Sequence, residues 1–128
     1  MKREIIFRGK RVANDKWVEG DLIQIFYLKE QKYIRRGEDE YWVDDNTVGQ
    51  FTGLRDKNGT KIFEGDLIIC NGSKKPLAVT YHNGCWECIP TKKYPNVSAD
   101  YRHRLEFDSE IEYEVVGNIY EESGKCSN

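Results

Sequence analysis

A short segment occurs twice in this chain, and each copy stands in the pattern of a β-hairpin. Glu-Gly-Asp-Leu-Ile occupies residues 19–23 and again residues 64–68, each time downstream of a Phe-x-Gly and a polar turn. Repeated supersecondary units bury their apolar faces against one another. The repeat therefore predicts two pseudo-symmetric hairpin units, at about residues 4–28 and 48–70, that share one compact body.

Both copies place Gly-Asp between apolar residues, and this predicts a bend in the strand. Glycine gives the backbone freedom at a bend, and an aspartate carboxylate can accept a hydrogen bond from a neighbouring backbone N–H. Before the second copy, Asn58-Gly59 supplies residues that tolerate a positive φ, as a tight turn requires. We interpret the following residues as a structural repeat motif: Glu19, Gly20, Asp21, Glu64, Gly65 and Asp66.

The composition and the spacing of turn residues favour strands along the whole chain. Isoleucine, valine and aromatic residues are plentiful, while alanine and methionine are scarce. Residues 77–81 and 85–89 flank Asn83-Gly84 and predict a hairpin. Residues 110–115 alternate between glutamate and apolar side chains, as in a half-buried strand. These patterns predict an all-β fold, either a small barrel or a sandwich, with little helix.

A single helical turn is the one exception that the sequence predicts. Residues 44–47 have the composition of a helix cap, which places the turn at residues 48–50. Shorter strands are expected on both sides of it, at residues 33–36, 40–43 and 66–70 and, with the least regular pattern, at residues 101–107.

The length of 128 residues predicts a single mostly-β domain over residues 1–121, followed by a flexible tail at residues 122–128. No segment approaches the roughly 20 apolar residues of a membrane-spanning helix. The first residues lack the apolar core of a secretory signal. We therefore expect a cytoplasmic protein whose four cysteines are free thiols.

Charge is distributed unevenly along the chain. Basic residues gather in residues 1–16, whereas residues 106–122 carry only acidic charges. The structural interpretation is that these ends pair within or between subunits, or form solvated faces. The alternative is a nucleic-acid-binding module in which cations contact phosphates and an aromatic ring stacks on a base. Its candidate contacts are Lys2, Arg3, Arg8, Lys10, Arg11, Tyr33 and Arg35.

Carboxylates and cysteines are the other candidates for chemistry. The duplicated pairs Glu19/Asp21 and Glu64/Asp66 could hold a divalent metal in a hydrolase, or could satisfy backbone donors in the repeat. The C-x-x-C of Cys85 and Cys88 lies in a strand-like segment, where residues three apart point to opposite faces.

That geometry favours structural thiols over a zinc or redox site. No catalytic triad, P-loop or dinucleotide fingerprint occurs, so the sequence predicts no catalytic residue and no cofactor.

The motifs spread over nearly the whole chain resemble the YopX family of small phage and prophage proteins. The matching segments are residues 2–10, 17–22, 47–54, 56–59, 62–68 and 115–121, while residues 71–107 match only loosely. The resemblance implies a β fold with SH3-like barrel character, a phage genome expressed in a bacterial cytoplasm, and no agreed catalytic residues.

The leading hypothesis is therefore a non-enzymatic phage accessory protein that acts as a protein-interaction module, with an unknown host or phage protein or a second copy of itself as partner. The first alternative is the nucleic-acid-binding module, and the second is the metal-dependent hydrolase.

Overall fold

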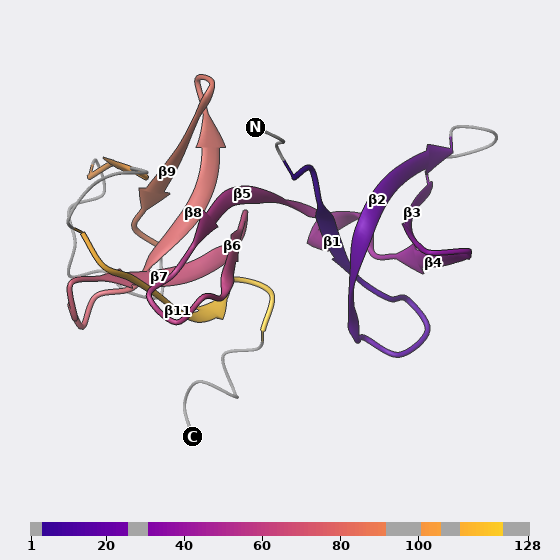
Figure 1. Ribbon diagram of the computed structural model, residues 1–128, viewed down its shortest axis with the longest axis horizontal. Coiled ribbons are helices and arrows are strands. Elements are labelled where there is room, and N and C mark those ends of the chain that lie inside the picture. Colours follow the sequence, from indigo (N-terminus) through magenta and orange to yellow (C-terminus); the bar gives the residue numbers. More distant parts are fainter. Residues whose placement is uncertain (1–3, 26–30, 92–100, 106–110, 122–128) are drawn as a thin grey trace. The chain divides into compact units, whose positions relative to one another are not determined.

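The computed structural model describes residues 4–25, 31–91, 101–105 and 111–121. The chain divides into two compact units, residues 1–53 and residues 54–128 (Figure 1). Within the described residues every regular element is a strand, apart from one turn of 3-10 helix. The predicted all-β class is confirmed.

Unit 1 is an antiparallel sheet. Its elements are β1 (Phe7–Lys10), β2 (Trp17–Ile25), β3 (Gln31–Arg36), β4 (Asp39–Val43), the 3-10 helix η1 (Asp45–Thr47) and the first part of β5 (Gly49–Arg55). The strand order is β4-β3-β2-β1-β5, and β6 follows β5 in the same order. Gly37, with a φ of 64°, lies in the turn between β3 and β4. These are the two short strands that the sequence predicted at residues 33–36 and 40–43.

The chain just after β1 also joins the far edge strand β4. Arg11 forms an isolated antiparallel bridge with Val43. The Val12 N–H donates to the Trp42 carbonyl oxygen at 3.0 Å, and the Asp44 N–H donates to the Lys10 carbonyl oxygen at 2.8 Å. The first and fourth strands are thereby linked, while SH3-like barrel character stays a prediction.

The core of unit 1 lies on one face of this sheet. Val18, Ile34 and Val43 are buried there. Partly buried apolar side chains pack against these three, namely Phe7, Leu22, Tyr41 and Val48. Since side chains alternate across a strand, the residues between these core positions point to the opposite face.

In the first copy of the repeat, Gly20 lies where β2 changes its neighbour. Residues 17–20 of β2 pair with β1, and residues 21–25 pair with β3. A Cβ atom on Gly20 would lie 2.0 Å from the carbonyl oxygen of Arg35, so only glycine fits without a backbone shift. Strand β2 continues through Gly20 and Asp21 without a break.

The helical turn lies earlier than the sequence predicted. The Asp44 carboxylate accepts a hydrogen bond from the Asn46 N–H at 3.0 Å and caps η1. Val48 is already extended, and the next residues begin β5. The prediction of a turn at residues 48–50 was wrong because Asp44 itself is the N-cap, so the turn must follow it directly.

Unit 2 holds the remaining strands. They are β6 (Lys61–Phe63), β7 (Asp66–Cys70), β8 (Leu77–His82), β9 (Cys85–Ile89), β10 (His103–Arg104) and β11 (Tyr113–Asn118). A five-stranded sheet has the order β10-β9-β8-β7-β11. Asn83 and Gly84, with φ of 51° and 80°, close the predicted β8–β9 hairpin. The strand predicted at residues 101–107 is shorter, and residues 106–107 lie outside the described part.

The core of unit 2 forms around the central strands. Its buried members are Ile62, Ile68, Leu77, Val79, Cys88, Leu105 and Tyr113. Ile111 and Val115 pack against it from either side of Tyr113, whereas Glu112 is exposed. The alternation expected around β11 is therefore confirmed.

The second copy of the repeat forms a tight turn between β6 and β7. Asp66 is only 1% exposed, and its Oδ2 accepts a hydrogen bond from the Phe63 N–H at 2.7 Å. Gly65 has a φ of 92°, and a Cβ atom there would lie 2.7 Å from the ring of Tyr120. The same five residues thus lie within one strand in unit 1, whereas in unit 2 the first two form a turn and the last three begin β7.

A second buried aspartate connects the turn after β5 to β11. Asp56 Oδ1 accepts from the Asn58 N–H at 2.8 Å and from the Thr60 N–H at 2.9 Å. Its Oδ2 accepts from the Val115 N–H at 2.9 Å. Burial raises the pKa of this carboxyl, but the N–H groups of Val115, Thr60 and Asn58 and the charge of Lys57 together hold the pKa below the ordinary aspartate value.

None of the helices in the described part of the chain has the length and apolar character that crossing a membrane demands. The single-domain boundary at residue 121 and the tail at residues 122–128 stay predictions, and the tail lies outside the described residues.

Candidate functional site

The face of unit 1 opposite its core carries an apolar row that crosses three adjacent strands. Ile23 on β2 pairs with Tyr33 on β3, which pairs with Trp42 on β4. Trp42 is 47% exposed, and the other two side chains are half-buried. Directly paired residues have side chains on the same face, so these three form one continuous patch.

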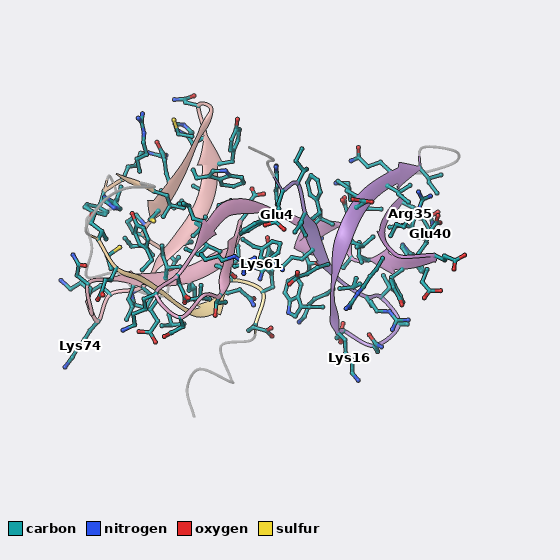
Figure 2. The ribbon with its side chains drawn as sticks, in the orientation of Figure 1. Glu4, Lys16, Arg35, Glu40, Lys61 and Lys74 are labelled. Carbon is teal, nitrogen blue, oxygen red and sulfur yellow. The ribbon has the colours of Figure 1, made fainter. Side chains whose placement is uncertain are left out.

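A charged row runs beside the apolar one. Asp21 pairs with Arg35, and Arg35 pairs with Glu40. Arg35 Nη2 donates to Glu40 Oε2 at 2.9 Å, and Figure 2 shows the two side chains together on the β3–β4 hairpin. We call the six residues of the two rows the outer face: Asp21, Ile23, Tyr33, Arg35, Glu40 and Trp42. It presents both signs of charge next to apolar surface.

Arg8, Lys10 and Arg11 of the predicted basic segment lie over aromatic rings. The Arg8 guanidinium is 4.6 Å from the centre of the Trp17 ring, and Lys10 Nζ is 5.8 Å from it. Arg11 lies 4.6 Å from the centre of the Tyr41 ring. Such contacts between a cation and a π face hold the charge against the protein surface. Lys2 and Arg3, the first two predicted contacts, lie outside the described residues.

The structure brings Tyr33 and Arg35 together on β3, but away from Arg11. Tyr33 and Arg35 belong to the outer face, whereas Arg11 lies over Tyr41, whose ring packs on the core face. The Tyr33 hydroxyl also contacts Gln31 Oε1 at 3.5 Å. Residues 1–53 contain as many acidic as basic residues, ten of each. The net charge of residues 1–53 is therefore zero.

The duplicated carboxylates occupy different environments. Glu19 and Asp21 are exposed on β2 in unit 1, while in unit 2 Glu64 lies in the turn and the buried Asp66 begins β7. Among the residues that the structure describes, no group of three or more histidine, cysteine or acidic side chains is arranged to hold a metal ion. The metal-dependent hydrolase gains no support from this geometry.

The C-x-x-C residues lie on β9 and differ in exposure. Cys88 is buried in the unit 2 core, and Cys85 is partly exposed. Burial, reinforced by the nearby Cys70 and Glu87, raises the pKa of the Cys88 thiol to about 12. A thiol with this pKa stays protonated at neutral pH and is a poor nucleophile or metal ligand.

The histidines contact neighbouring side chains of unit 2. His82 Nδ1 lies 3.5 Å from Glu87 Oε1, which also pairs with Arg102 Nη1 at 2.5 Å. His103 Nε2 lies 3.3 Å from the Tyr113 hydroxyl. These contacts join β8, β9, β10 and β11, and they give both histidines structural partners.

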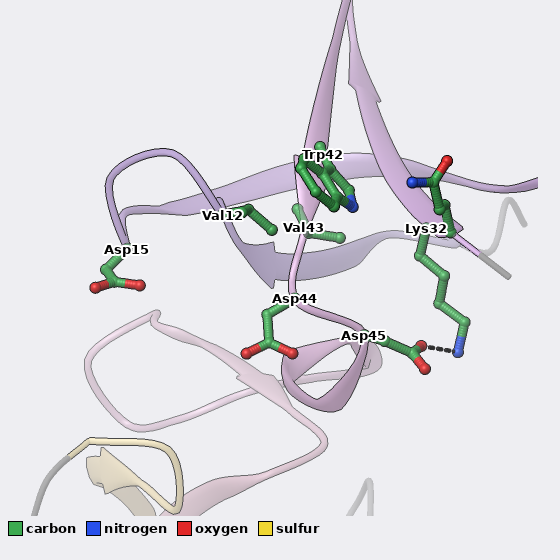
Figure 3. Close-up of a pocket in the computed structure, with 8 residues that line it drawn as sticks. Val12, Asp15, Lys32, Trp42, Val43, Asp44 and Asp45 are labelled. Atoms are coloured by element: carbon green, nitrogen blue, oxygen red, sulfur yellow. Dashed lines mark ion pairs between the residues drawn. The ribbon is translucent and has the colours of Figure 1, made fainter. Parts of the chain in front are cut away.

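A pocket of about 360 Å³ opens at the end of β4 in unit 1 (Figure 3). It is lined by Val12, Asp15, Gln31, Lys32, Trp42, Val43, Asp44 and Asp45. Sequence reasoning missed it, because its lining comes from three separate segments. The exposed pair Asp44-Asp45 after a strand was the only local signal.

Taken together, these features define an all-β protein with an apolar and charged sheet face and a small acidic pocket beside it. The family model described as YopX protein matches residues 6–125. The chain belongs to the YopX family, as the sequence resemblance indicated. No curated protein matches the chain significantly.

Proposed function

We propose that this chain is a non-enzymatic accessory protein of phage or prophage origin, acting in the bacterial cytoplasm, which binds a protein partner through the outer face. The observation that carries the proposal is the apolar row of Ile23, Tyr33 and Trp42. Exposed aromatic side chains surrounded by polar groups are typical of protein interfaces.

The charge pattern favours a protein partner over nucleic acid. Phosphate backbones are bound by cations in excess. On the outer face, Arg35 pairs with Glu40 and neighbours Asp21, so both signs occur together. Protein surfaces have charges of both signs, and such an arrangement sets the orientation of a partner.

The scaffold that we propose for this face is an SH3-like barrel in unit 1. The Arg11–Val43 bridge supports it, because the bridge links the first strand to the fourth. A second copy of this chain is one protein that could cover the face, and the test below separates that case from a foreign partner.

The test uses a photo-crosslinking residue at position 23, in the bacterium that encodes the protein. A matched control carries the same residue at position 74, on an exposed loop of unit 2. We expect discrete crosslinked products at position 23 alone, and their loss in Trp42→Ala. Loss of a central aromatic contact costs about 2 kcal/mol, or about thirtyfold in Kd. Mass spectrometry then identifies the product as a foreign protein or a second copy.

Two results would contradict the proposal. One is the same set of products at positions 23 and 74, or none at position 23. The other is tight binding of labelled DNA or RNA that weakens steeply with salt and is lost when Arg8, Lys10 and Arg11 are all replaced by alanine.

A further inference from the structure

The pocket beside the outer face combines an aromatic wall with carboxylates. In Figure 3 the Trp42 ring lies above Val12 and Val43, and Asp15, Asp44 and Asp45, which also line the pocket, lie below them in the view. Val12 is 45% exposed and contributes apolar surface to the pocket. An apolar floor and an acidic rim occur in the same concave site.

The cations of the chain itself neutralise only part of the negative charge of this pocket. Lys32 Nζ forms an ion pair with Asp45, and Figure 3 marks this contact. One Asp44 oxygen accepts the N–H of Asn46 and so caps η1. Among the residues that the structure describes, no cation pairs with Asp15 or Asp44. Two carboxylates without an ion pair therefore line the pocket that the indole also lines.

Unit 1 already shows how its aromatic rings are covered by cations. Arg8 lies over Trp17 and Arg11 over Tyr41, both at 4.6 Å from the ring centre. Within the described part of the chain, no cation lies over Trp42. Its ring has the same kind of exposed π face, with carboxylates nearby to hold a charge above it.

We propose that this pocket receives an arginine side chain of the protein partner. The guanidinium stacks on the Trp42 ring, its N–H groups donate to the carboxylates of Asp15 and Asp44, and its methylene groups contact Val12. This inference rests on the proposed function, since it specifies the chemistry of the partner that covers the outer face.

The choice of arginine follows from the shape and polarity of the pocket. A planar guanidinium stacks on an aromatic ring and presents several donors at once, whereas an ammonium is a strongly hydrated point charge. A bare divalent cation prefers a shell made of oxygens. The indole and the valine methyl groups fit the organic cation instead.

The experiment uses the full chain labelled with 5-fluorotryptophan. Each of its three tryptophans then gives a fluorine resonance, and Trp42→Phe assigns that of residue 42. The probe is Nα-acetyl-arginine amide, and the control is Nα-acetyl-citrulline amide, which has nearly the same shape without the charge. We expect a saturable shift of the Trp42 resonance with the arginine probe, with a Kd on the order of millimolar.

The decisive variant is Asp15→Asn with Asp44→Asn. Asparagine keeps the N-cap of η1 and tolerates the φ of 59° at position 15, so this variant removes charge alone. We expect its Kd for the arginine probe to rise about threefold to tenfold, as for two exposed charge pairs. The control variant Glu38→Gln with Asp39→Asn removes equal charge at the opposite end of β4 and leaves Kd unchanged.

Three results would each overturn the inference. They are no saturable shift with the arginine probe, equal affinity for the citrulline probe, and unchanged affinity for the arginine probe in the Asp15/Asp44 variant. Unchanged Trp17 and Trp86 resonances verify that this variant is folded. Partner crosslinking separates this inference from the proposed function. If crosslinking is lost in Trp42→Ala but unchanged in the Asp15/Asp44 variant, the arginine inference fails and the proposed function stands.

Discussion

Asp56 is the side chain whose replacement tests the packing of unit 2 most directly. It is only 7% exposed, and its carboxylate accepts three backbone hydrogen bonds, from Asn58, Thr60 and Val115. A hydrogen bond to a charged group contributes about 1.5 kcal/mol or more, and such contributions are not strictly additive. We expect Asp56→Ala to lower the free energy of unfolding by about 3 to 5 kcal/mol.

Asp56→Asn should also destabilise unit 2, by about 2 kcal/mol. Asn58 and Thr60 donate to one oxygen and Val115 donates to the other. An amide has a single oxygen, so its NH2 group must face at least one N–H donor. The control is Glu112→Gln, an exposed position near β11, for which a change within about 0.5 kcal/mol is expected.

The assay is urea unfolding followed by the fluorescence of Trp86, with Trp17 and Trp42 replaced by phenylalanine. Its pH dependence has a definite sign. Because the pKa of Asp56 is lowered in the folded state, its stabilisation is complete above the unfolded pKa of about 3.9 and is lost as pH falls through the folded value. An Asp56→Asn variant as stable as the parent at pH 7, or a difference that grows in acid, would refute the reasoning.

Two further predictions concern close packing. Gly20→Ala should lower the free energy of unfolding of unit 1 by about 3 kcal/mol or more, because the added Cβ would meet the Arg35 carbonyl oxygen. The control Asp21→Ala, at an exposed position, should change stability little. Equal melting temperatures of the two variants, measured by Trp42 fluorescence, would contradict this. At pH 8, iodoacetamide should alkylate Cys85 well before Cys88, whose pKa is raised to about 12, and peptide mass spectrometry of the native protein showing equal rates would contradict it.

The parts of the fold that local chemistry decides could be predicted from the sequence. Asn83-Gly84 both adopt positive φ, as a two-residue hairpin turn requires, and β7 spans the predicted residues 66–70. Alternation alone predicted that Ile111, Tyr113 and Val115 face the core.

The conformation that each copy of the repeat adopts depends on the residues that pack against it. Gly20 lies beneath the Arg35 carbonyl, while Gly65 lies against Tyr120, and neither neighbour can be identified from the repeated residues. Identical segments therefore gave a continuous strand in one copy, and a turn followed by the start of β7 in the other. The exposure of Trp42 likewise depends on its strand, because its neighbour Val43 takes the core position on β4 and the indole points to the opposite face.

The candidate site could be predicted only in part. The cations of the basic segment were identified, but their positions over Trp17 and Tyr41 depend on strand register. The pocket was missed because Asp15 and Asp44 come to line one pocket only through the pairing of Arg11 with Val43.

That pairing has a consequence for the order of events during synthesis. The walls of the pocket come from residues 12–15, 31–32 and 42–45, and hydrogen bonds between Lys10, Val12, Trp42 and Asp44 hold the first and last of these together. Chains are synthesised from the N-terminus, so residues 12–15 cannot form the pocket until residues 42–45 have been synthesised. A nascent or clipped chain ending before residue 42 lacks one wall. A partner that recognises the pocket therefore selects finished copies of unit 1 over incomplete ones.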